Sequence, residues 1–488
     1  MMKRNIILGL FFAIVSVTNA QWQQIGQDID GEAEGDYSGW SVSLSSDGTI
    51  VAIGAYQNDN GNGDNSGSVR IYENQNGVWQ QIGQDIDGEA EGDYSGWSVS
   101  LSSDGTIVAI GAYRNDNGNG DNSGHVRIYE NQNGTWVQVG SDIDGRIGDV
   151  HSGYSVSLSS DGTVVAIGVV DDSSDGGDWS GRVRIYENQD GVWQLIGQDI
   201  EGKAMFEHFG RSVSLNSDGT IVAIGASDEG DGVVRIYENQ NGTWVQVGSD
   251  FKFSEVDNNL GRFVSLSSDG TIVAIGAPWN DENEVNSGRV RIYENQNGVW
   301  QQIGQDIEGE AEGDYSGWSV DLNNDGSIVA IGSVYNAENG NNSGHVRVYE
   351  NQGGVWRQIG QNIDGEAAED YSGVSVSLNS DGSTVAIGAP WNDGNGNVSG
   401  QVRVYSLLNL GVNSVENKSN INIFPNPTTG EIIIKSTNLE QIEIYNNNGV
   451  LIEVTDNGYI DLRNQSKGVY FVKVITKNNI ITKKIIVE

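Results

Sequence analysis

The chain has 488 residues, with 67 Asp and Glu against 26 Lys and Arg, a formal net charge of −41 and no cysteine. This charge repels phosphate backbones and anionic lipid headgroups, so we expect no nucleic-acid partner and no binding to a membrane surface. The lack of cysteine excludes disulfides, thiolate zinc sites and cysteine nucleophiles, and the four histidines leave little for a metal triad.

The start of the chain has the pattern of a secretory signal. Two basic residues precede an apolar run over 6–17, and small residues stand at 18–20, before a cleavage point. The apolar run is shorter than the about 20 residues of a membrane-spanning helix. We predict a signal peptide over residues 1–20, export from the cell, and no transmembrane segment once the signal is removed.

The middle of the chain is a repeat marked by tryptophan. The repeated residue occurs at Trp22, Trp79, Trp136, Trp193, Trp244, Trp300 and Trp356. Within the first unit, apolar runs and period-two alternation predict strands at 22–25, 41–45, 50–53 and 69–72, with tight turns at 46–48 and 74–77 and longer Gly-, Asn- and Asp-rich segments at 30–40 and 55–67. Each unit is therefore expected to form a four-stranded antiparallel sheet.

Seven such units predict an all-β fold, a seven-bladed β-propeller over residues 21–405. The tryptophan strand is present before the first full unit and missing after the last. If residues 22–29 supply the outermost strand of a blade begun by 374–405, seven blades are complete and the N-terminal strand closes the ring. An open solenoid would need capping units, and neither end resembles one.

Two landmarks connect these units to a known family. Phe209-Gly210 precedes the first strand of the fourth unit, and Gly-Ala-Pro follows the second strand at 276–278 and 388–390. These motifs resemble FG-GAP repeats, the blades of integrin-like propellers, in their bacterial form. The resemblance implies the propeller fold. The calcium loop of integrin-type blades is missing, since only Ser45-Ser46-Asp47-Gly48 stands between the first two strands, so calcium binding does not carry over.

The C-terminal part differs in chemistry. Residues 406–420 are expected to be a polar linker, and alternating apolar runs in 421–488 predict a small β-sandwich. This segment is similar to the type IX secretion C-terminal sorting domain of Bacteroidetes, on the residues Pro425, Asn426, Pro427, Gly430, Gly449 and Gly468. The resemblance implies contact with the type IX machinery, and a protein that is secreted or attached to the outer cell surface of a Gram-negative bacterium.

The acidity belongs to the repeats. Residues 21–405 hold 16 basic and 59 acidic side chains. Because loops that leave alternate strands share one face of a propeller, the two long segments of each unit should lie together and form a strongly negative face. Such a face would attract Ca²⁺ or cationic groups, although solvation of a secreted protein explains it as well.

Two loops offer oxygen donors at alternate positions and are weak candidates for calcium. They contain Asn58, Asn60, Asn62 and Asp64 in the first unit, and Asn115, Asn117, Asn119 and Asp121 in the second. The leading residues are amides and no glutamate closes either loop, so simple turns are the alternative. No other cofactor is indicated.

Two residue types repeat for structural reasons. One arginine occupies the same position in all seven units, at Arg70, Arg127, Arg184, Arg235, Arg291, Arg347 and Arg403, and each should pair with a carboxylate. The seven repeat tryptophans should pack between blades. His125, His151, His208 and His345 have no partner nearby in sequence, and no catalytic motif is present.

Asymmetry between units is the best guide to a ligand. Units three to five depart from the rest, and Lys203, Met205, Phe206, His208 and Phe209 bring apolar and basic character to an acidic face. We expect a monomeric surface or extracellular module that binds a protein or glycan, as in adhesion. The alternatives are a polysaccharide lyase or hydrolase that uses loop carboxylates, and a passive structural ring.

Overall fold

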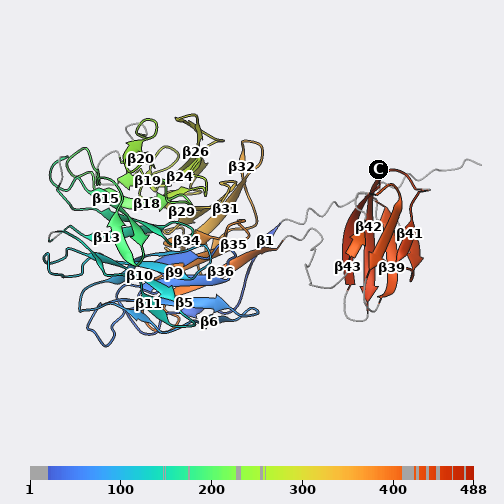
Figure 1. Cartoon of the computed structure of the whole chain (residues 1–488), viewed down its shortest axis with the longest axis horizontal. Helices are drawn as coiled ribbons and strands as arrows, with labels where there is room; N and C mark the ends of the chain where they lie inside the picture. Colours follow the sequence, from blue (N-terminus) through green and yellow to red (C-terminus); the bar gives the residue numbers. More distant parts are fainter. Residues whose placement is uncertain are drawn as a thin grey trace, which may run out of the picture. The chain divides into compact units, whose positions relative to one another are not determined.

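The computed structural model describes residues 20–146, 148, 150–173, 176–226, 232–252, 257–258, 260–408, 422–424, 428–435, 439–446, 451–463, 465–476 and 480–487. None of these residues lies in a helix, so this part of the chain offers no helix long and apolar enough to cross a bilayer. Residues 20–408 form one compact unit, and the described residues after 408 belong to another (Figure 1).

The described residues of the first unit form seven antiparallel sheets with four main strands each, and one further two-stranded sheet. Blades 1 to 4 contain β3 (Ser41–Leu44), β4 (Ile50–Ala55), β5 (Ser68–Asn74) and β6 (Trp79–Gln81); β8 (Ser95–Leu101), β9 (Ile107–Ala112), β10 (His125–Asn131) and β11 (Trp136–Gln138); β13 (Ser152–Leu158), β14 (Val164–Val169), β15 (Arg182–Gln189) and β16 (Val192–Leu195); β18 (Phe209–Leu215), β19 (Ile221–Ala226), β20 (Val233–Asn239) and β21 (Trp244–Gln246).

Blades 5 to 7 follow the same order. They contain β23 (Val264–Leu266), β24 (Ile272–Ala277), β26 (Arg289–Gln296) and β27 (Val299–Gln302); β29 (Ser316–Leu322), β30 (Ile328–Ser333), β31 (His345–Asn351) and β32 (Trp356–Gln358); β34 (Ser375–Leu378), β35 (Thr384–Ala389), β36 (Gln401–Leu408) and β1 (Gln21–Gln24). In blade 7, β1 pairs with β36, with Trp22 opposite Leu407. The predicted propeller, and its closure by the N-terminal strand, are therefore confirmed.

The structure adds short strands that the sequence pattern did not reveal. A two-residue strand pairs with the third strand of six blades: β2 (Ile29–Asp30), β7 (Ile86–Asp87), β12 (Ile143–Asp144), β17 (Ile200–Glu201), β28 (Ile307–Glu308) and β33 (Ile363–Asp364). Blade 5 carries an additional pair, β22 (Asp257–Asn258) with β25 (Trp279–Asn280). These strands tie each long segment back to the blade before it.

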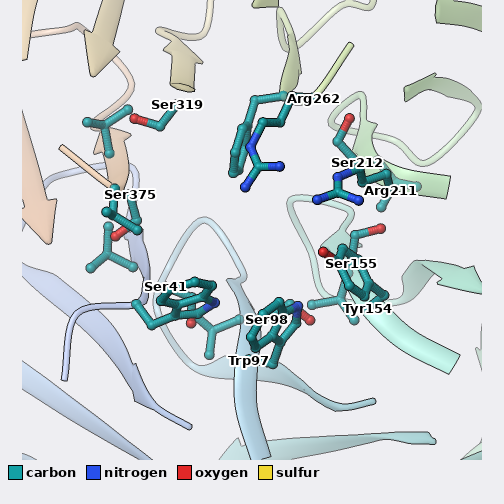
Figure 2. Close-up of a pocket in the computed structure, with 18 of the residues that line it drawn as sticks. Ser41, Trp97, Ser98, Tyr154, Ser155, Arg211, Ser212, Arg262, Ser319 and Ser375 are labelled. Atoms are coloured by element: carbon teal, nitrogen blue, oxygen red, sulfur yellow. The ribbon is translucent and has the colours of Figure 1, made fainter. Parts of the chain in front are cut away.

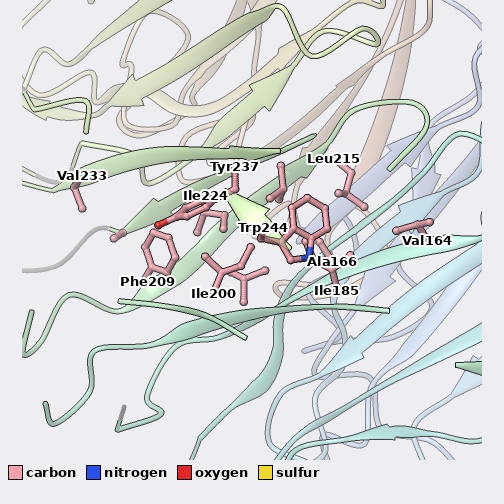
Figure 3. Packing of buried hydrophobic residues seen from close by; sticks show 13 residues of the cluster. Val164, Ala166, Ile185, Ile200, Phe209, Leu215, Ile224, Val233, Tyr237 and Trp244 are labelled. Atoms are coloured by element: carbon pink, nitrogen blue, oxygen red, sulfur yellow. The ribbon is translucent and has the colours of Figure 1, made fainter. Parts of the chain in front are cut away.

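The second strand of each blade is fully buried because both of its faces meet a neighbouring blade. Val51, Ala52 and Ile53 of β4 are at most 1% exposed, which explains the continuous apolar run in the sequence. Between blades 3 and 4, Val164, Ile185, Phe209, Leu215 and Trp244 pack into one such core (Figure 3). The repeated tryptophans lie at these interfaces as predicted, and Trp79 Nε1 donates a hydrogen bond to Ile25 O at 2.8 Å.

A ladder of hydrogen bonds joins the innermost strands around the ring. Ser43 Oγ accepts a hydrogen bond from Leu101 N of the next blade, at 3.0 Å, and equivalent bonds recur around the ring up to Ser377 Oγ with Leu44 N, also at 3.0 Å. Asp321 takes the place of the serine in blade 6, where one carboxylate oxygen accepts from Leu378 N at 2.8 Å. This ladder closes the ring at its centre, and the pairing of β1 with β36 closes it at the rim.

Asp321 makes stability depend on pH. Burial raises the pKa of Asp321 to about 6. Since the folded protein then holds this proton more tightly than the unfolded chain, the contribution is fully present below about pH 4 and is lost as the pH rises through about 6, on the order of 2 kcal/mol. We expect Asp321→Ser, which restores the serine of the other blades, to flatten that part of the curve. Denaturation at pH 4 and pH 7 of both proteins checks this, and identical pH dependence would contradict it.

The second unit is the predicted small β-sandwich. Its strands are β37 (Asn422–Phe424), β38 (Glu431–Lys435), β39 (Leu439–Asn446), β40 (Leu451–Thr455), β41 (Tyr459–Asp461), β42 (Gly468–Thr476) and β43 (Ile480–Val487). A three-stranded and a four-stranded sheet bury Ile432, Ile444 and Val472 between them. Of the predicted motif, Gly430 has a φ of 121° and Gly468 a φ of 147°, whereas Pro425, Asn426, Pro427 and Gly449 lie outside the described residues, as do residues 1–19 of the predicted signal.

Candidate functional site

A cavity of about 230 Å³ lies where the innermost strands of all seven blades meet. Its mouth is formed by one residue per blade, the residue that follows a glycine at, or just before, the start of the first strand: Trp40, Trp97, Tyr154, Arg211, Arg262, Trp318 and Val374. Serine hydroxyls line the next level, and Figure 2 shows them around the opening. Four aromatic rings, two arginines and one valine therefore surround the axis.

The glycine before each of these residues is required by geometry. Gly96 has a φ of 87°, and a Cβ there would lie 2.6 Å from the backbone oxygen of Ser68 in the preceding blade. The neighbouring backbone can approach this closely only because the side chain is missing. The glycine thus fixes where the following residue, Trp97, enters the cavity wall.

An unbroken series of aromatic contacts surrounds most of the mouth. It runs through Trp318, Trp279, Tyr315, Tyr335, Tyr371, Trp391, Trp40, Trp97 and Tyr154. The ring centroids of Trp40 and Trp97 are 4.7 Å apart, and those of Tyr315 and Tyr335 are 4.8 Å apart. Planar apolar faces of this kind, fixed by their neighbours, form a stacking surface for a ligand with flat or ring-shaped apolar faces.

Backbone strain accompanies this belt. Six equivalent residues in the loops before the inner strands have a positive φ between 48° and 57°: Tyr37, Tyr94, His151, His208, Tyr315 and Tyr371. The left-handed conformation costs a non-glycine residue about 1–3 kcal/mol, and such strain gathers at functional sites. The loops around the mouth therefore hold their side chains in positions that local preference alone would not select.

The two arginines complete the circle where the aromatic belt ends. Arg211 lies over the ring of Tyr154, with 5.5 Å from Cζ to the centroid, and Arg262 lies over Trp318 at 4.0 Å. Figure 2 shows both guanidinium groups directed into the cavity. Neither forms an ion pair with a described residue, and Arg262 Nε has no hydrogen-bond partner among them. Burial and the charge of Arg211 lower the pKa of Arg262 to about 10, which leaves Arg262 charged at neutral pH.

The seven repeated arginines behave differently, because each pairs with a carboxylate as predicted. The partners are Glu32 for Arg70, Glu89 for Arg127, Asp172 and Asp199 for Arg184, Glu207 and Asp250 for Arg235, Asp306 for Arg291, Glu310 for Arg347 and Glu366 for Arg403. These guanidiniums, buried in every blade except for the partly buried Arg291, hold the long loops to the blades. Arg211 and Arg262 differ from these seven residues because neither forms an ion pair with a described residue.

The predicted calcium loops use their amide groups within the protein. Asn60 Nδ2 donates to Gly67 O and Asn62 Nδ2 to Gly88 O, while Asn60 Oδ1 accepts from Asn62 N. The second blade repeats this arrangement at Asn117 and Asn119. Asn58 and Asn115 are buried, and Asp64 and Asp121 are exposed. These amides order the loops, and calcium at this place stays a prediction.

The sequence predicts an asymmetric region in blades 3 to 5, and its segment between blades 3 and 4 is partly exposed and apolar. Met205 and Phe206 are exposed beside Trp179, whose ring meets Phe206 edge-on at 5.4 Å. Phe209 is instead part of the core, and Lys203 forms an ion pair with Asp250 at 3.5 Å. Two histidines that are distant in sequence, His151 and His208, both contact Asp171. The basic side chains of this region thus contact carboxylates, while Met205 and Phe206 remain open to solvent.

The axial ring of residues at the cavity mouth was not predicted from the sequence. A signal was present, since alignment of the seven units on the glycine before the first strand gives Trp, Trp, Tyr, Arg, Arg, Trp and Val at the next position. Two adjacent arginines at an otherwise largely aromatic position are the departure that marks the site. Only the closed ring brings these residues together, because they are about 50 residues or more apart in the chain.

Comparison with known proteins agrees with this architecture. The secretion system C-terminal sorting domain family matches residues 422–488, and the FG-GAP repeat family matches residues 29–72 and 86–129. No curated protein matches the chain.

Several solved structures are similar at low identity. A putative 6-phosphogluconolactonase from Bacteroides uniformis is 13% identical, with 67% of this chain and 85% of that chain covered and a TM-score of 0.46. A β-propeller domain from Myceliophteria thermophila is 12% identical, with 80% and 100% covered and a TM-score of 0.49. The periplasmic gluconolactonase of Pseudomonas aeruginosa is 16% identical, with 67% and 85% covered and a TM-score of 0.45. Likeness this distant says nothing about activity.

The chain is therefore an all-β protein that carries FG-GAP repeats in a propeller and ends in a type IX sorting domain, which marks proteins released from, or attached to, the outer cell surface.

Proposed function

We propose that the propeller is an extracellular binding module, and that it holds an acidic oligosaccharide at the mouth of the axial cavity. The observation that carries this proposal is the pair Arg211 and Arg262, two guanidiniums without an ion pair among the described residues, inside a wall of aromatic rings. Guanidinium groups bind carboxylates through paired hydrogen bonds, and aromatic faces stack on sugar rings. A uronic acid unit presents both features.

The negative charge of the whole chain does not prevent an anion from binding here. At physiological ionic strength the Debye length is about 8 Å, so exposed carboxylates at the rim act weakly on the axis. Inside the cavity the two arginines are the nearest charges, and the low polarity of the aromatic wall strengthens their attraction. Their mutual repulsion, which contributes to the lowered pKa of Arg262, would be relieved by a bound carboxylate.

The same site favours binding over catalysis. The described residues that line the cavity include no carboxylate and no histidine, the groups that glycosidases and lyases use as general acids and bases. Its volume of about 230 Å³ is below the about 300–1,000 Å³ of pockets that enclose drug-sized ligands. The cavity therefore suits the acidic unit of a longer chain, whose neighbouring sugars would lie on the aromatic belt.

The test compares one sugar with and without its charge. We expect the full chain to bind oligogalacturonate, and to bind its methyl ester at least tenfold more weakly, since the ester keeps the ring and removes the carboxylate. Calorimetry measures the two affinities, and a reducing-end assay on the same samples should show no turnover. Equal affinity for acid and ester, preference for an acidic peptide, or cleavage of the polymer would each overturn the proposal.

A further inference from the structure

The first residue of the third strand occupies the same place in every blade, next to the acidic loops. It is Ser68, His125, Arg182, Val233, Arg289, His345 and Gln401 in blades 1 to 7. In blade 3, Arg182 pairs with Asp172 at 2.7 Å and with Asp199 at 2.8 Å. In blade 5, Arg289 pairs with Asp306 at 2.8 Å and also contacts Glu282. Two blades therefore place a cation among the carboxylates here.

Blades 2 and 6 have a buried histidine at this place. His125 is 1% exposed and His345 is fully buried. Nδ1 of His125 lies 3.9 Å from a carboxylate oxygen of Glu89 and 3.9 Å from one of Asp142, which is too far for a hydrogen bond. Nδ1 of His345 lies 4.0 Å from Glu310. Both ring nitrogens of His345, and Nε2 of His125, have no hydrogen-bond partner among the described residues.

These imidazoles do not replace the arginine charge. Burial, and the charge of the neighbouring Arg127 or Arg347, lower the pKa of His125 to about 4 and that of His345 to about 3. Both rings are therefore neutral at pH 7, with a lone pair available to a metal. Around His345 stand the carboxylates of Glu310, Glu338 and Asp364, with Arg347 beside Glu310 and Arg403 near Asp364.

The carboxylates of these clusters have fewer cationic partners than those of the arginine blades. In blades 2 and 6, Glu89 has only Arg127, at 3.4 Å, and Glu310 only Arg347, at 3.6 Å, as arginine partners among the described residues. In blade 3, Asp199 contacts Arg146, Arg182 and Arg184, and in blade 5 Asp306 contacts Arg289 and Arg291. Blades 2 and 6 thus hold more negative charge than their side chains balance.

We propose that the clusters Glu89–His125–Asp142 and Glu310–His345–Glu338 each bind a divalent transition-metal ion of the Zn²⁺ type. The potential ligand atoms of each cluster already lie within 4.8 Å of one another. Ligation at about 2.0–2.2 Å needs only a modest contraction, and one imidazole with two carboxylates is a ligand set that zinc accepts and calcium does not prefer. Glu89 and Glu310 are exposed enough to move. In blade 6, Asn362 Nδ2 donates to both Glu310, at 3.2 Å, and Glu338, at 3.1 Å, and holds the two carboxylates together.

The chain supplies its own substitutions for the test. His125→Arg and His345→Arg copy the arginine of blades 3 and 5, so they should keep the fold while filling the site with an internal cation. Ser68→Arg makes the same change in a blade without histidine and is the matched control. Equilibrium dialysis of the full chain against ZnCl₂, with metal analysis, measures the number of bound ions. Excess CaCl₂ in the buffer suppresses nonspecific binding to exposed acids.

We expect the wild-type chain and Ser68→Arg to bind the same number of zinc ions, each histidine variant to bind one fewer, and the double variant two fewer. The melting temperature of the wild type should rise with zinc and return with chelator, and the double variant should lose both responses at an unchanged or higher metal-free melting temperature. Zinc stoichiometry unaffected by the two substitutions would overturn the proposal, as would a wild type that binds no zinc at micromolar concentration. Neither result depends on whether the axial cavity binds a sugar.

Discussion

Substitution of Trp22 by alanine should destabilise the propeller by about 3–5 kcal/mol, the range for loss of a buried aromatic side chain. Trp22 is 4% exposed, and its Nε1 donates to Ile359 O in blade 6 at 2.9 Å. Gln361 clamps its backbone on both sides, through hydrogen bonds to Trp22 N and O. These contacts hold β1, the longer of the two N-terminal strands that pair with β36 in blade 7.

Two equivalent tryptophans distinguish the effect of lost core packing from the effect of lost ring closure. Trp79 is buried to the same degree and makes the same kind of hydrogen bond, but its strand continues directly from blade 1. Trp193 is only partly buried, so Trp193→Ala should lower the free energy of unfolding least of the three substitutions. Denaturant unfolding ranks the three alanine variants. Hydrogen exchange should show loss of protection along β36 in Trp22→Ala and not in Trp79→Ala, and equal protection of β36 in both would contradict closure through β1.

Removal of the two axial arginines should have the largest effect on ligand binding. A hydrogen bond to a charged group contributes about 1.5–3 kcal/mol, so Arg211→Gln and Arg262→Gln should each weaken oligogalacturonate binding by about tenfold to a hundredfold. Glutamine keeps part of the volume and the ability to donate hydrogen bonds, and neither arginine supports an ion pair with a described residue. Stability should therefore change little or improve, since their mutual repulsion is removed.

Arg357 provides the control for this experiment. It is exposed on β32, away from the residues that line the cavity, so Arg357→Gln makes the same change in net charge without touching the site. Calorimetry of the three single variants against the same sugar gives the comparison. An equal loss for Arg357→Gln would indicate a long-range electrostatic effect, and no loss for either axial variant would exclude the arginines from the site.

The parts of the fold that sequence could predict are those set by local periodicity. The tryptophan rhythm and the buried run at 50–53 define the blades, because each depends on residues close together in one unit. Closure could be predicted because the regular repeat leaves one strand over at the N-terminus. The repeated arginines were equally predictable, since any buried guanidinium needs a carboxylate. The two-residue strands such as β7 were not, because a pair of residues carries too little pattern.

The candidate sites depend on contacts between residues far apart in the chain, and these contacts could not be predicted from the sequence. Arg211 and Arg262 meet only after the ring closes, and His125 meets Glu89 and Asp142 only because the folded blade brings separate segments together. Phe209 shows the opposite case, since its place in an irregular segment suggested a surface and the structure buries it completely. Comparison of equivalent positions across blades recovers part of this information, because the repeat supplies its own reference for what is ordinary.

A crystal structure of the full chain with a bound uronic acid oligosaccharide tests the central proposal most directly. We predict the sugar at the axis, with one carboxylate within hydrogen-bond distance of both Arg211 and Arg262 and its ring against Trp97 or Trp318. Sugar bound instead at the exposed patch of Trp179, Met205 and Phe206, or anywhere else with the axial cavity free of it, would contradict the account.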